Sequence, residues 1–277
     1  MKDFIKRHSL VLGIVLMFLL TWPIDLSNSG VLSFQIPYIV MIFSGWGFVF
    51  ASIIMTGLTL GKAGVISILK RYLQWRVGWK WFAVALILSP TLFILGIYIN
   101  AALTGIAPDY STILIYRIMG KSANLPLLVL PWLIYEAIAN GEEIGWRGYV
   151  LPRLQAKYSA LTSTLILGAI WGFWHLPKFL SDFDAIHFAW FMAHTFAQAV
   201  ILTWIYNGTK GSLLMATLYH ASSNTVGMFV PIANTLSNAN MGSYIAVVML
   251  EVATAFIIVI MAGAAHLSRT EEKQVQE

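Results

Sequence analysis

Long runs of apolar residues alternate with short polar segments along nearly the whole chain. A helix that crosses a hydrocarbon core of about 30 Å needs roughly 20 mostly apolar residues, and these runs are about that long. The pattern predicts about eight transmembrane helices, near residues 9–26, 36–60, 80–103, 125–151, 159–177, 187–206, 212–232 and 243–267. We therefore predict an all-α, polytopic membrane protein.

The basic residues between these runs predict how the helices are oriented. With a cytoplasmic amino terminus, only three basic residues fall in outer loops: Arg117, Lys121 and Lys178. Thirteen then face the cytoplasm: Lys2, Lys6, Arg7, Lys62, Lys70, Arg71, Arg76, Lys80, Arg153, Lys157, Lys210, Arg269 and Lys273. This excess follows the positive-inside rule. We predict that both termini are cytoplasmic, and that residues 61–81 form a cytoplasmic loop or an interfacial helix.

Composition supports this assignment and narrows the chemistry. Hydrophobic residues make up 58% of the chain and charged residues 10%, with a mean hydropathy of +0.76, whereas soluble domains carry about 25% charged residues. We predict a single domain over residues 1–277 in the cell membrane, because no linker or repeat divides the chain. Topology explains the net charge of +5 without a nucleic-acid partner. The absence of cysteine excludes disulfides, thiolate metal ligands and a cysteine nucleophile.

Three charged side chains lie close together inside the predicted span 125–151: Glu142, Glu143 and Arg147. A charge at the centre of a membrane helix costs at least about 2.5–3.5 kcal/mol on insertion scales, so such residues usually serve a function. Glu143 and Arg147 are four residues apart, which makes them neighbours on one helical face where they can pair. Glu142 points about 100° away from that face and is a candidate general base. The alternative is a purely structural charge cluster, with Glu136 as a further partner or a packing residue.

Two later spans contribute polar residues of their own. His175 precedes Leu176-Pro177, which should end or kink the helix just beyond it. An isolated histidine in an apolar helix is more often a packing residue, but polar groups in neighbouring spans favour a catalytic role. His220 and Asn224 are one turn apart, so one helix can present both to the same point. Both can donate hydrogen bonds to a developing oxyanion, and one such donor can contribute about 2.7–4 kcal/mol.

These three groups resemble, in order, the motifs of the CAAX protease and bacteriocin-processing (CPBP, or Abi) family, which includes the type II CAAX prenyl endopeptidases. Residues 142–147 match EExxxR, residues 171–175 match FxxxH with Trp171 in place of phenylalanine, and residues 220–224 match HxxxN/D. The resemblance covers residues 124–232, which we expect to form the catalytic core. Residues before Asn124 carry no recognisable motif.

The resemblance implies an intramembrane glutamic endopeptidase that acts without a cofactor or metal ion. Glu142 would activate a water molecule together with His175, and His220 and Asn224 would hold the oxyanion of the tetrahedral intermediate. The supporting residues would be those that orient the site, namely Glu143 and Arg147. The substrate would be a peptide or protein, with or without a lipid modification, in contact with membrane lipid. The oligomeric state and the physiological substrate are not encoded in these motifs.

Two other functions fit the same residues. A zinc metalloprotease could use His175, His220 and Glu142 as ligands, although the chain contains no HExxH sequence. A transporter, immunity or scaffold protein could use the polar groups without hydrolysing a substrate. The other histidines within or near spans have no assigned role, namely His187, His194 and His266. For the pair formed by His194 and Gln198, hydrogen bonding between helices is the expected role.

The predicted depths of the candidate residues conflict with straight helices. Counted at about 1.5 Å per residue from the inner ends, Glu142 and His220 lie about 12–14 Å deep, whereas His175 lies nearer 24 Å. Residues at such different depths cannot meet in one site. We therefore expect tilted or broken helices around a water-filled cavity, as ionisable groups in a membrane require.

Overall fold

The computed structural model describes residues 2–34, 36–37, 40, 44–121, 124–181, 183–232 and 241–268. Within these ranges the regular structure is entirely helical. The α-helices are α1 (Lys2–Arg7), α2 (Ser9–Asn28), α4 (Trp46–Tyr72), α5 (Trp79–Thr104), α6 (Ile115–Met119), α7 (Leu125–Ala139), α8 (Leu151–Gln155), α9 (Ala160–Trp174), α10 (Ala185–Gly208), α11 (Leu213–Phe229) and α12 (Met241–Ala262). Shorter elements are the 3-10 helices η1 (Tyr110–Thr112) and η3 (Leu176–Phe179) and the π-helix η2 (Ile144–Val150).

Within the described residues, five helices are long and apolar enough to cross a membrane: α2, α4, α5, α10 and α12. The predicted all-α polytopic membrane protein is thereby confirmed. The other three predicted spans contain shorter helices, because α7 stops at Ala139, α9 at Trp174 and α11 at Phe229. Part of the predicted span 36–60 lies outside the described residues, as does the charged tail after Ser268.

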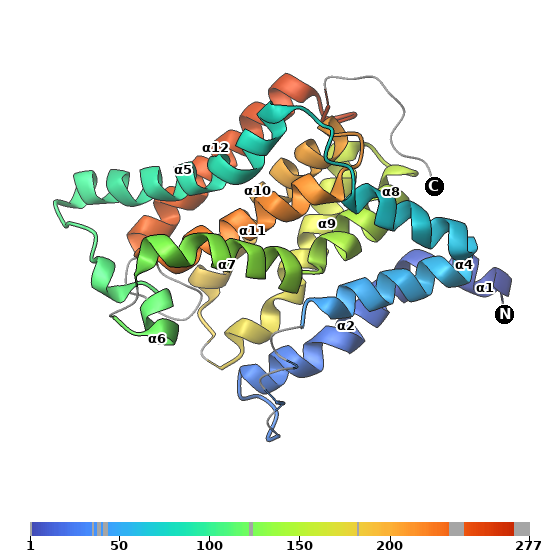
Figure 1. The fold of residues 1–277 in the computed structure, drawn as a ribbon, viewed down its shortest axis with the longest axis horizontal. Helices are drawn as coiled ribbons and strands as arrows, with labels where there is room; N and C mark the ends of the chain where they lie inside the picture. The colour runs from blue at the N-terminus through green and yellow to red at the C-terminus, as the bar shows by residue number, and fades with distance from the viewer. Residues whose placement is uncertain are drawn as a thin grey trace.

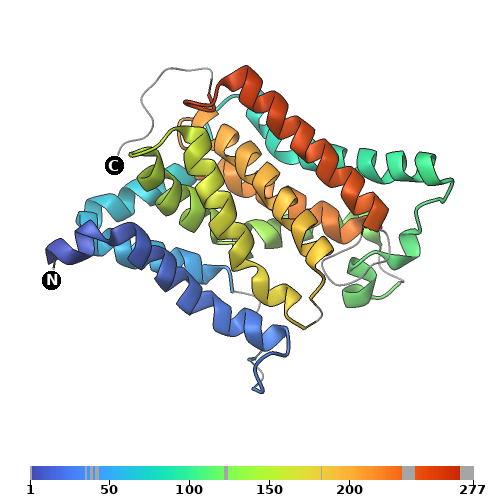
Figure 2. The ribbon, with the colours of Figure 1, turned by 180° about the vertical axis from the view of Figure 1, so that it is seen from behind.

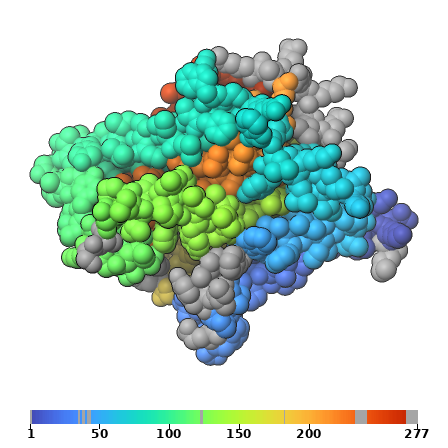
Figure 3. All heavy atoms as spheres, in the orientation of Figure 1, coloured from blue at the N-terminus to red at the C-terminus, as the bar shows by residue number. Residues whose placement is uncertain are grey.

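The helices form a bundle in which α11 is central. α2 packs against α4 at one side, and α5 packs against α12 at the other. Between these pairs, α10 contacts α9 and α12, while α11 contacts α5, α7 and α10 (Figures 1 and 2). In the space-filling view of Figure 3, α11 is visible in a narrow strip between α5 and α7. Its position between other helices explains why most of its side chains are buried, including small polar ones.

The predicted helix over residues 125–151 is broken between Ala139 and Glu142. Asn140 has extended backbone angles, and Asn140 Oδ1 accepts the backbone N–H of Glu142 at 3.0 Å, which caps the segment that follows. At the break the chain touches the start of α4, where a Cβ atom on Gly141 would lie 2.5 Å from the carbonyl oxygen of Gly45. A side chain therefore does not fit at Gly141. The continuous helix predicted here is wrong, because this close contact ends α7 before the charged motif begins.

The prediction of a loop or interfacial helix at residues 61–81 agrees with the structure only in part. α4 continues through this region to Tyr72, with a kink at Gly61, where φ is 69°. This left-handed conformation suits glycine and changes the direction of the helix. A short connection then leads to α5.

Four of the basic residues predicted to be cytoplasmic lie together at one end of the bundle. Lys6, Arg7, Arg153 and Lys157 line a common surface groove between α1 and α8. The start of the chain and the end of α12 also lie toward this end (Figures 1 and 2). This arrangement fits the predicted location of both termini on one side of the membrane. Which side is cytoplasmic stays a prediction from the charge distribution.

Candidate active site

Glu142 lies in the interior of the bundle, directly after the break that ends α7. Its side chain is buried, and its Oε2 accepts hydrogen bonds from the indole N–H groups of Trp171 at 2.8 Å and Trp146 at 3.3 Å. Both donors bind the same oxygen, so Oε1 has no hydrogen-bond donor among the described residues. The carboxylate is thus oriented through one oxygen and available for chemistry through the other.

Glu143 connects the first and third motifs. Its Oε1 accepts a hydrogen bond from Arg147 Nη1 at 2.9 Å and one from His220 Nδ1 at 2.8 Å. All three side chains are buried, and the predicted contact between Glu143 and Arg147 is confirmed. Because a carboxylate only accepts hydrogen bonds, the proton of the His220 ring that faces it is on Nδ1. His220 Nε2 is therefore the ring nitrogen that is left for a substrate.

Trp171 lies at the centre of the site and contacts all three motifs. While its indole binds Glu142, its backbone carbonyl accepts a hydrogen bond from His175 Nδ1 at 2.9 Å. Its ring centroid is 5.4 Å from that of His220, and the Arg147 guanidinium lies over the ring at 4.7 Å. A carbonyl oxygen only accepts, so a neutral His175 carries its proton on Nδ1 and offers the lone pair of Nε2. His175 thus has the tautomer that an acceptor of protons needs.

The position of His175 resolves the conflict in predicted depth. The residue is the C-cap of α9. The α-helix ends there, and the 3-10 helix η3, which contains Pro177, follows directly. Glu142 in turn lies at a helix break and not in the middle of a straight span. Two interrupted helices therefore bring together residues that straight helices would keep apart. No hydrogen bond joins Glu142 directly to His175 among the described contacts; Trp171 bridges them.

Asn224 lies one turn after His220 on α11 and binds a different carboxylate. Its Nδ2 donates to Glu136 Oε2 on α7 at 3.0 Å, and the side chain is exposed at the surface of the structure. Glu136, whose role the sequence left open, is thus the partner of Asn224. The two candidate site residues of α11, His220 and Asn224, each bind a carboxylate from the region around the α7 break. One N–H of the Asn224 amide is left for another acceptor.

The described residues contain no group of three His, Asp or Glu side chains arranged to hold a metal ion. The ligands named for the zinc alternative, Glu142, His175 and His220, do not form such a group. Both imidazoles use Nδ1 for a hydrogen bond, to the Trp171 carbonyl and to Glu143. Each ring therefore keeps Nε2 for a proton or for another partner.

A second buried polar cluster joins α10 to α12. Glu251 Oε2 accepts a hydrogen bond from His194 Nδ1 at 2.6 Å, and its Oε1 accepts one from Gln198 Nε2 at 2.7 Å. The expected hydrogen bonding of His194 and Gln198 between helices is confirmed, but the sequence analysis missed Glu251 as their partner. The signal was present, since Glu251 is an isolated acid in the last predicted span. The two indole donors to Glu142 were also missed.

Comparison with known proteins agrees with the motif assignment. Residues 121–226 match the family described as type II CAAX prenyl endopeptidase Rce1-like, and this segment contains all three motifs. The predicted resemblance to the CAAX protease family is confirmed. A stretch of 91 residues is 28% identical to CAAX prenyl protease 2 of Methanococcus maripaludis, and it covers 30% of this chain and 34% of that protein. The chain thus spans about a third of the length of this curated relative.

Proposed function

We propose that the chain is an intramembrane endopeptidase that hydrolyses a peptide bond with a water molecule activated by Glu142 and His175. The observation that carries this proposal is the meeting of the three motifs around Trp171, which contacts Glu142, His175 and His220 at once. A base, a second proton acceptor and a group of hydrogen-bond donors suffice for direct attack of water on an amide. No covalent intermediate with the protein is required.

In the proposed reaction, Glu142 is the general base. Its Oε1 takes a proton from the water molecule as the water oxygen attacks the carbonyl carbon of the substrate. The Oε2 atom keeps its bonds to the two indole groups, which hold the carboxylate in place throughout. When the tetrahedral intermediate collapses, the C–N bond breaks and the proton passes from Glu142 to the leaving nitrogen. His175 Nε2 accepts a hydrogen bond from the same water and fixes the direction of attack.

The oxyanion of the intermediate is stabilised from α11. His220 donates through Nε2 when its ring is doubly protonated, and the Glu143 carboxylate at 2.8 Å from Nδ1 stabilises that imidazolium. Asn224 donates through the amide N–H that Glu136 does not use. Arg147 neutralises the charge of Glu143, so that the buried carboxylate does not repel the oxyanion.

The class of substrate follows from the relatives and is part of the proposal. The family description and the name of the archaeal relative both refer to prenylated CAAX sequences. We propose a peptide with a prenylated cysteine near its carboxyl terminus as the substrate class, cleaved after the cysteine. A site between membrane helices suits such a substrate, since the lipid enters from the bilayer while the peptide reaches the polar residues.

The test is a comparison of membrane proteomes from cells that express wild type or Glu142→Gln at equal levels. We expect substrates to keep their carboxyl-terminal residues in the variant and to lose them in the wild type. Asp109→Asn is the control, because Asp109 is an exposed acid outside the spans. An unchanged set of carboxyl termini between wild type and Glu142→Gln would support a transporter, immunity or scaffold role instead.

A second test separates the proposed mechanism from the zinc alternative. If Glu142 and His175 alone activate water, hydrolysis survives exhaustive treatment with a chelator. A zinc enzyme would lose its activity with the chelator, regain it with added metal, and hold one zinc per chain. Elemental analysis of the purified protein alongside the kinetics distinguishes the two outcomes.

A further inference from the structure

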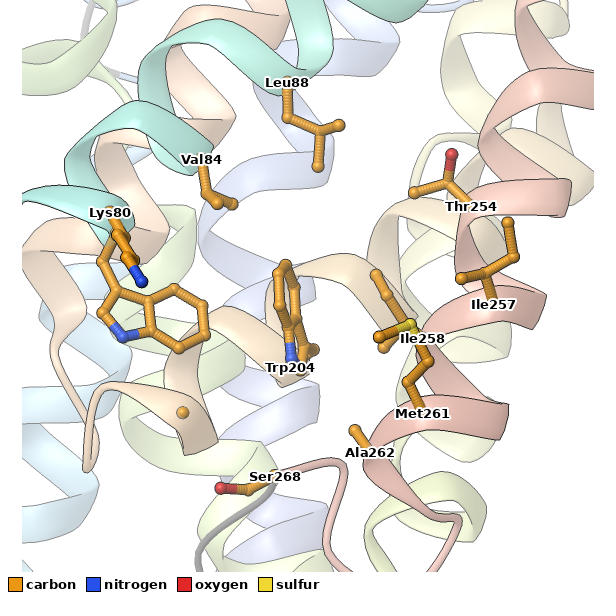
Figure 4. A pocket seen from close by; sticks show the side chains of 12 residues that line it. Lys80, Val84, Leu88, Trp204, Thr254, Ile257, Ile258, Met261, Ala262 and Ser268 are labelled. Atoms are coloured by element: carbon orange, nitrogen blue, oxygen red, sulfur yellow. The ribbon is translucent and has the colours of Figure 1, made fainter.

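A crevice of about 630 Å³ opens between α5, α10 and α12, away from the residues of the candidate site. Val84 and Leu88 of α5 line one wall, Trp204 of α10 lies at the back, and Ile257, Ile258 and Met261 of α12 form the other wall (Figure 4). The volume is in the range of sites that bind small molecules. All three helices are long and apolar enough to span a membrane, so an acyl chain of the bilayer can reach these apolar walls.

The aromatic residues of the crevice are packed in a fixed arrangement. The Trp81 and Trp204 ring centroids are 4.9 Å apart, and the Trp81 ring lies directly on Gly208, where a Cβ atom would be 2.4 Å from it. Only the absence of a side chain at Gly208 lets the ring take this position. Tryptophan is enriched at the boundary between lipid and water, which places this end of the crevice at the membrane surface.

The mouth of the crevice carries a positive charge. Lys80, Gly208 and Ser268 line it, at or beyond the ends of α5, α10 and α12. Lys80 is exposed and forms no ion pair with any described residue. Its ammonium group is thus available to an anion at the membrane surface, directly above an apolar chamber that enters the bilayer.

We propose that this crevice binds one anionic phospholipid, with an acyl chain between α5 and α12 and the phosphate beside Lys80. Apolar walls recognise the chain, because each buried methylene group contributes about 0.8 kcal/mol. The lysine recognises the phosphate, as basic pockets between membrane helices do for anionic headgroups. The charge selects among lipids, whereas the walls bind any chain. This proposal does not depend on the proposed protease activity.

The test uses the full-length protein, purified in detergent and stripped of lipid, and native mass spectrometry to count bound lipid. Phosphatidylglycerol and phosphatidylcholine with identical chains are titrated in parallel. We expect one phosphatidylglycerol to bind more tightly than phosphatidylcholine. Lys80→Gln should weaken phosphatidylglycerol by about fivefold, as expected for the loss of one cation near an anionic headgroup, and leave phosphatidylcholine unchanged.

Two further variants test the apolar walls. Val84→Trp fills the crevice and should weaken the binding of both lipids, while Ile87→Trp, at an exposed position of α5 that does not line the crevice, should weaken neither. Lys62→Gln, an exposed cation of α4 that does not line the crevice, is the control for charge. If Val84→Trp does not fold, the comparison of Lys80→Gln with Lys62→Gln still tests whether phosphatidylglycerol binds beside Lys80.

Three results would overturn the assignment. Equal binding of both lipids by wild type would mean that the contact is not selective for charge. Equal losses in Lys80→Gln and Lys62→Gln would mean that any surface cation has the same effect. Displacement of bound phosphatidylglycerol by a farnesylated peptide would assign the crevice to the substrate.

Discussion

The two kinds of helix in this molecule differ in what they bury. α5 and α12 are long, and α12 exposes Phe256, Ile257, Ile260 and Met261, all more than 50% accessible, to the surroundings of the bundle. The segments that carry the motifs are short or interrupted, and their charged side chains face inward. Lipid contact requires only apolar side chains on a continuous helix. A polar site requires backbone breaks that aim side chains inward, together with partners that satisfy every buried charge.

The largest expected loss of stability concerns the buried ion pair of Glu143 and Arg147. Arg147→Ala leaves the Glu143 carboxylate buried beside His220 alone, and Glu143→Gln leaves the Arg147 guanidinium without its charge partner. Each should lower the free energy of unfolding by roughly 3–5 kcal/mol, the range for breaking a buried pair. Folded yield and thermal unfolding in detergent measure the effect.

The control for that experiment is an arginine outside the bundle interior. Arg76 is exposed and lies over the Trp75 ring, with the guanidinium 5.2 Å from the ring centroid. Arg76→Ala should change stability by no more than about 0.5 kcal/mol. Equal losses of stability in Arg76→Ala and Arg147→Ala would show that the buried ion pair does not stabilise the protein more than an exposed arginine does.

An intermediate loss of stability is expected within α12, because this helix carries both a buried acid and exposed apolar side chains. Glu251→Ala removes the acceptor of His194 and Gln198 and should cost about 1–3 kcal/mol, the range for leaving buried partners unsatisfied. Phe256→Ala removes a larger side chain that is 66% exposed, and should change stability by about 0.5 kcal/mol or less. Thermal unfolding of the two variants, matched for lipid content, checks the order. A larger loss in Phe256→Ala would contradict it.

The smallest expected effect is a loss of turnover at the centre of the site. Trp171→Phe keeps a ring against His220 and Arg147 but removes the N–H donor to Glu142. The proposed general base is then held by Trp146 alone. We expect kcat/KM to fall by about tenfold with unchanged folded yield, since a hydrogen bond to a charged group contributes about 1.5–3 kcal/mol and Trp146 keeps donating.

Trp22→Phe is the matched control for this experiment. The Trp22 indole also donates to α9, at 2.9 Å, but to the backbone carbonyl of Trp174. This variant should leave kcat/KM unchanged. An unchanged kcat/KM in Trp171→Phe, or an equal loss in both variants, would show that the indole does not hold the general base.

The sequence predicted the long apolar helices well, because hydropathy is a local property. The predicted spans 80–103 and 187–206 agree with α5 and α10 to within two residues at each end. The contact between Glu143 and Arg147 was also predictable, because both residues lie within one helical turn. The end of α7 at Ala139 was not predictable, because it depends on the contact between Gly141 and Gly45, which are far apart in the sequence.

Contacts between residues far apart in the sequence also limit what can be predicted of the candidate site. Motif spacing identified His220 but not its bond to Glu143, 77 residues away. Replacement of the family phenylalanine by Trp171 looks conservative by size, yet it adds the N–H that binds Glu142. Glu251 carried a visible signal, a charge in an apolar span, but its partners on α10 become evident only when the helices are packed.

Turnover of a defined peptide by the purified protein tests whether Glu142 is the base of a membrane endopeptidase. Wild type and Glu142→Gln, both reconstituted in lipid with chelator present, are given a farnesylated CAAX peptide, and the released carboxyl-terminal fragment is quantified by mass spectrometry. We predict steady cleavage by wild type and none above background by a folded Glu142→Gln protein. Full activity of Glu142→Gln would show that Glu142 is not the base.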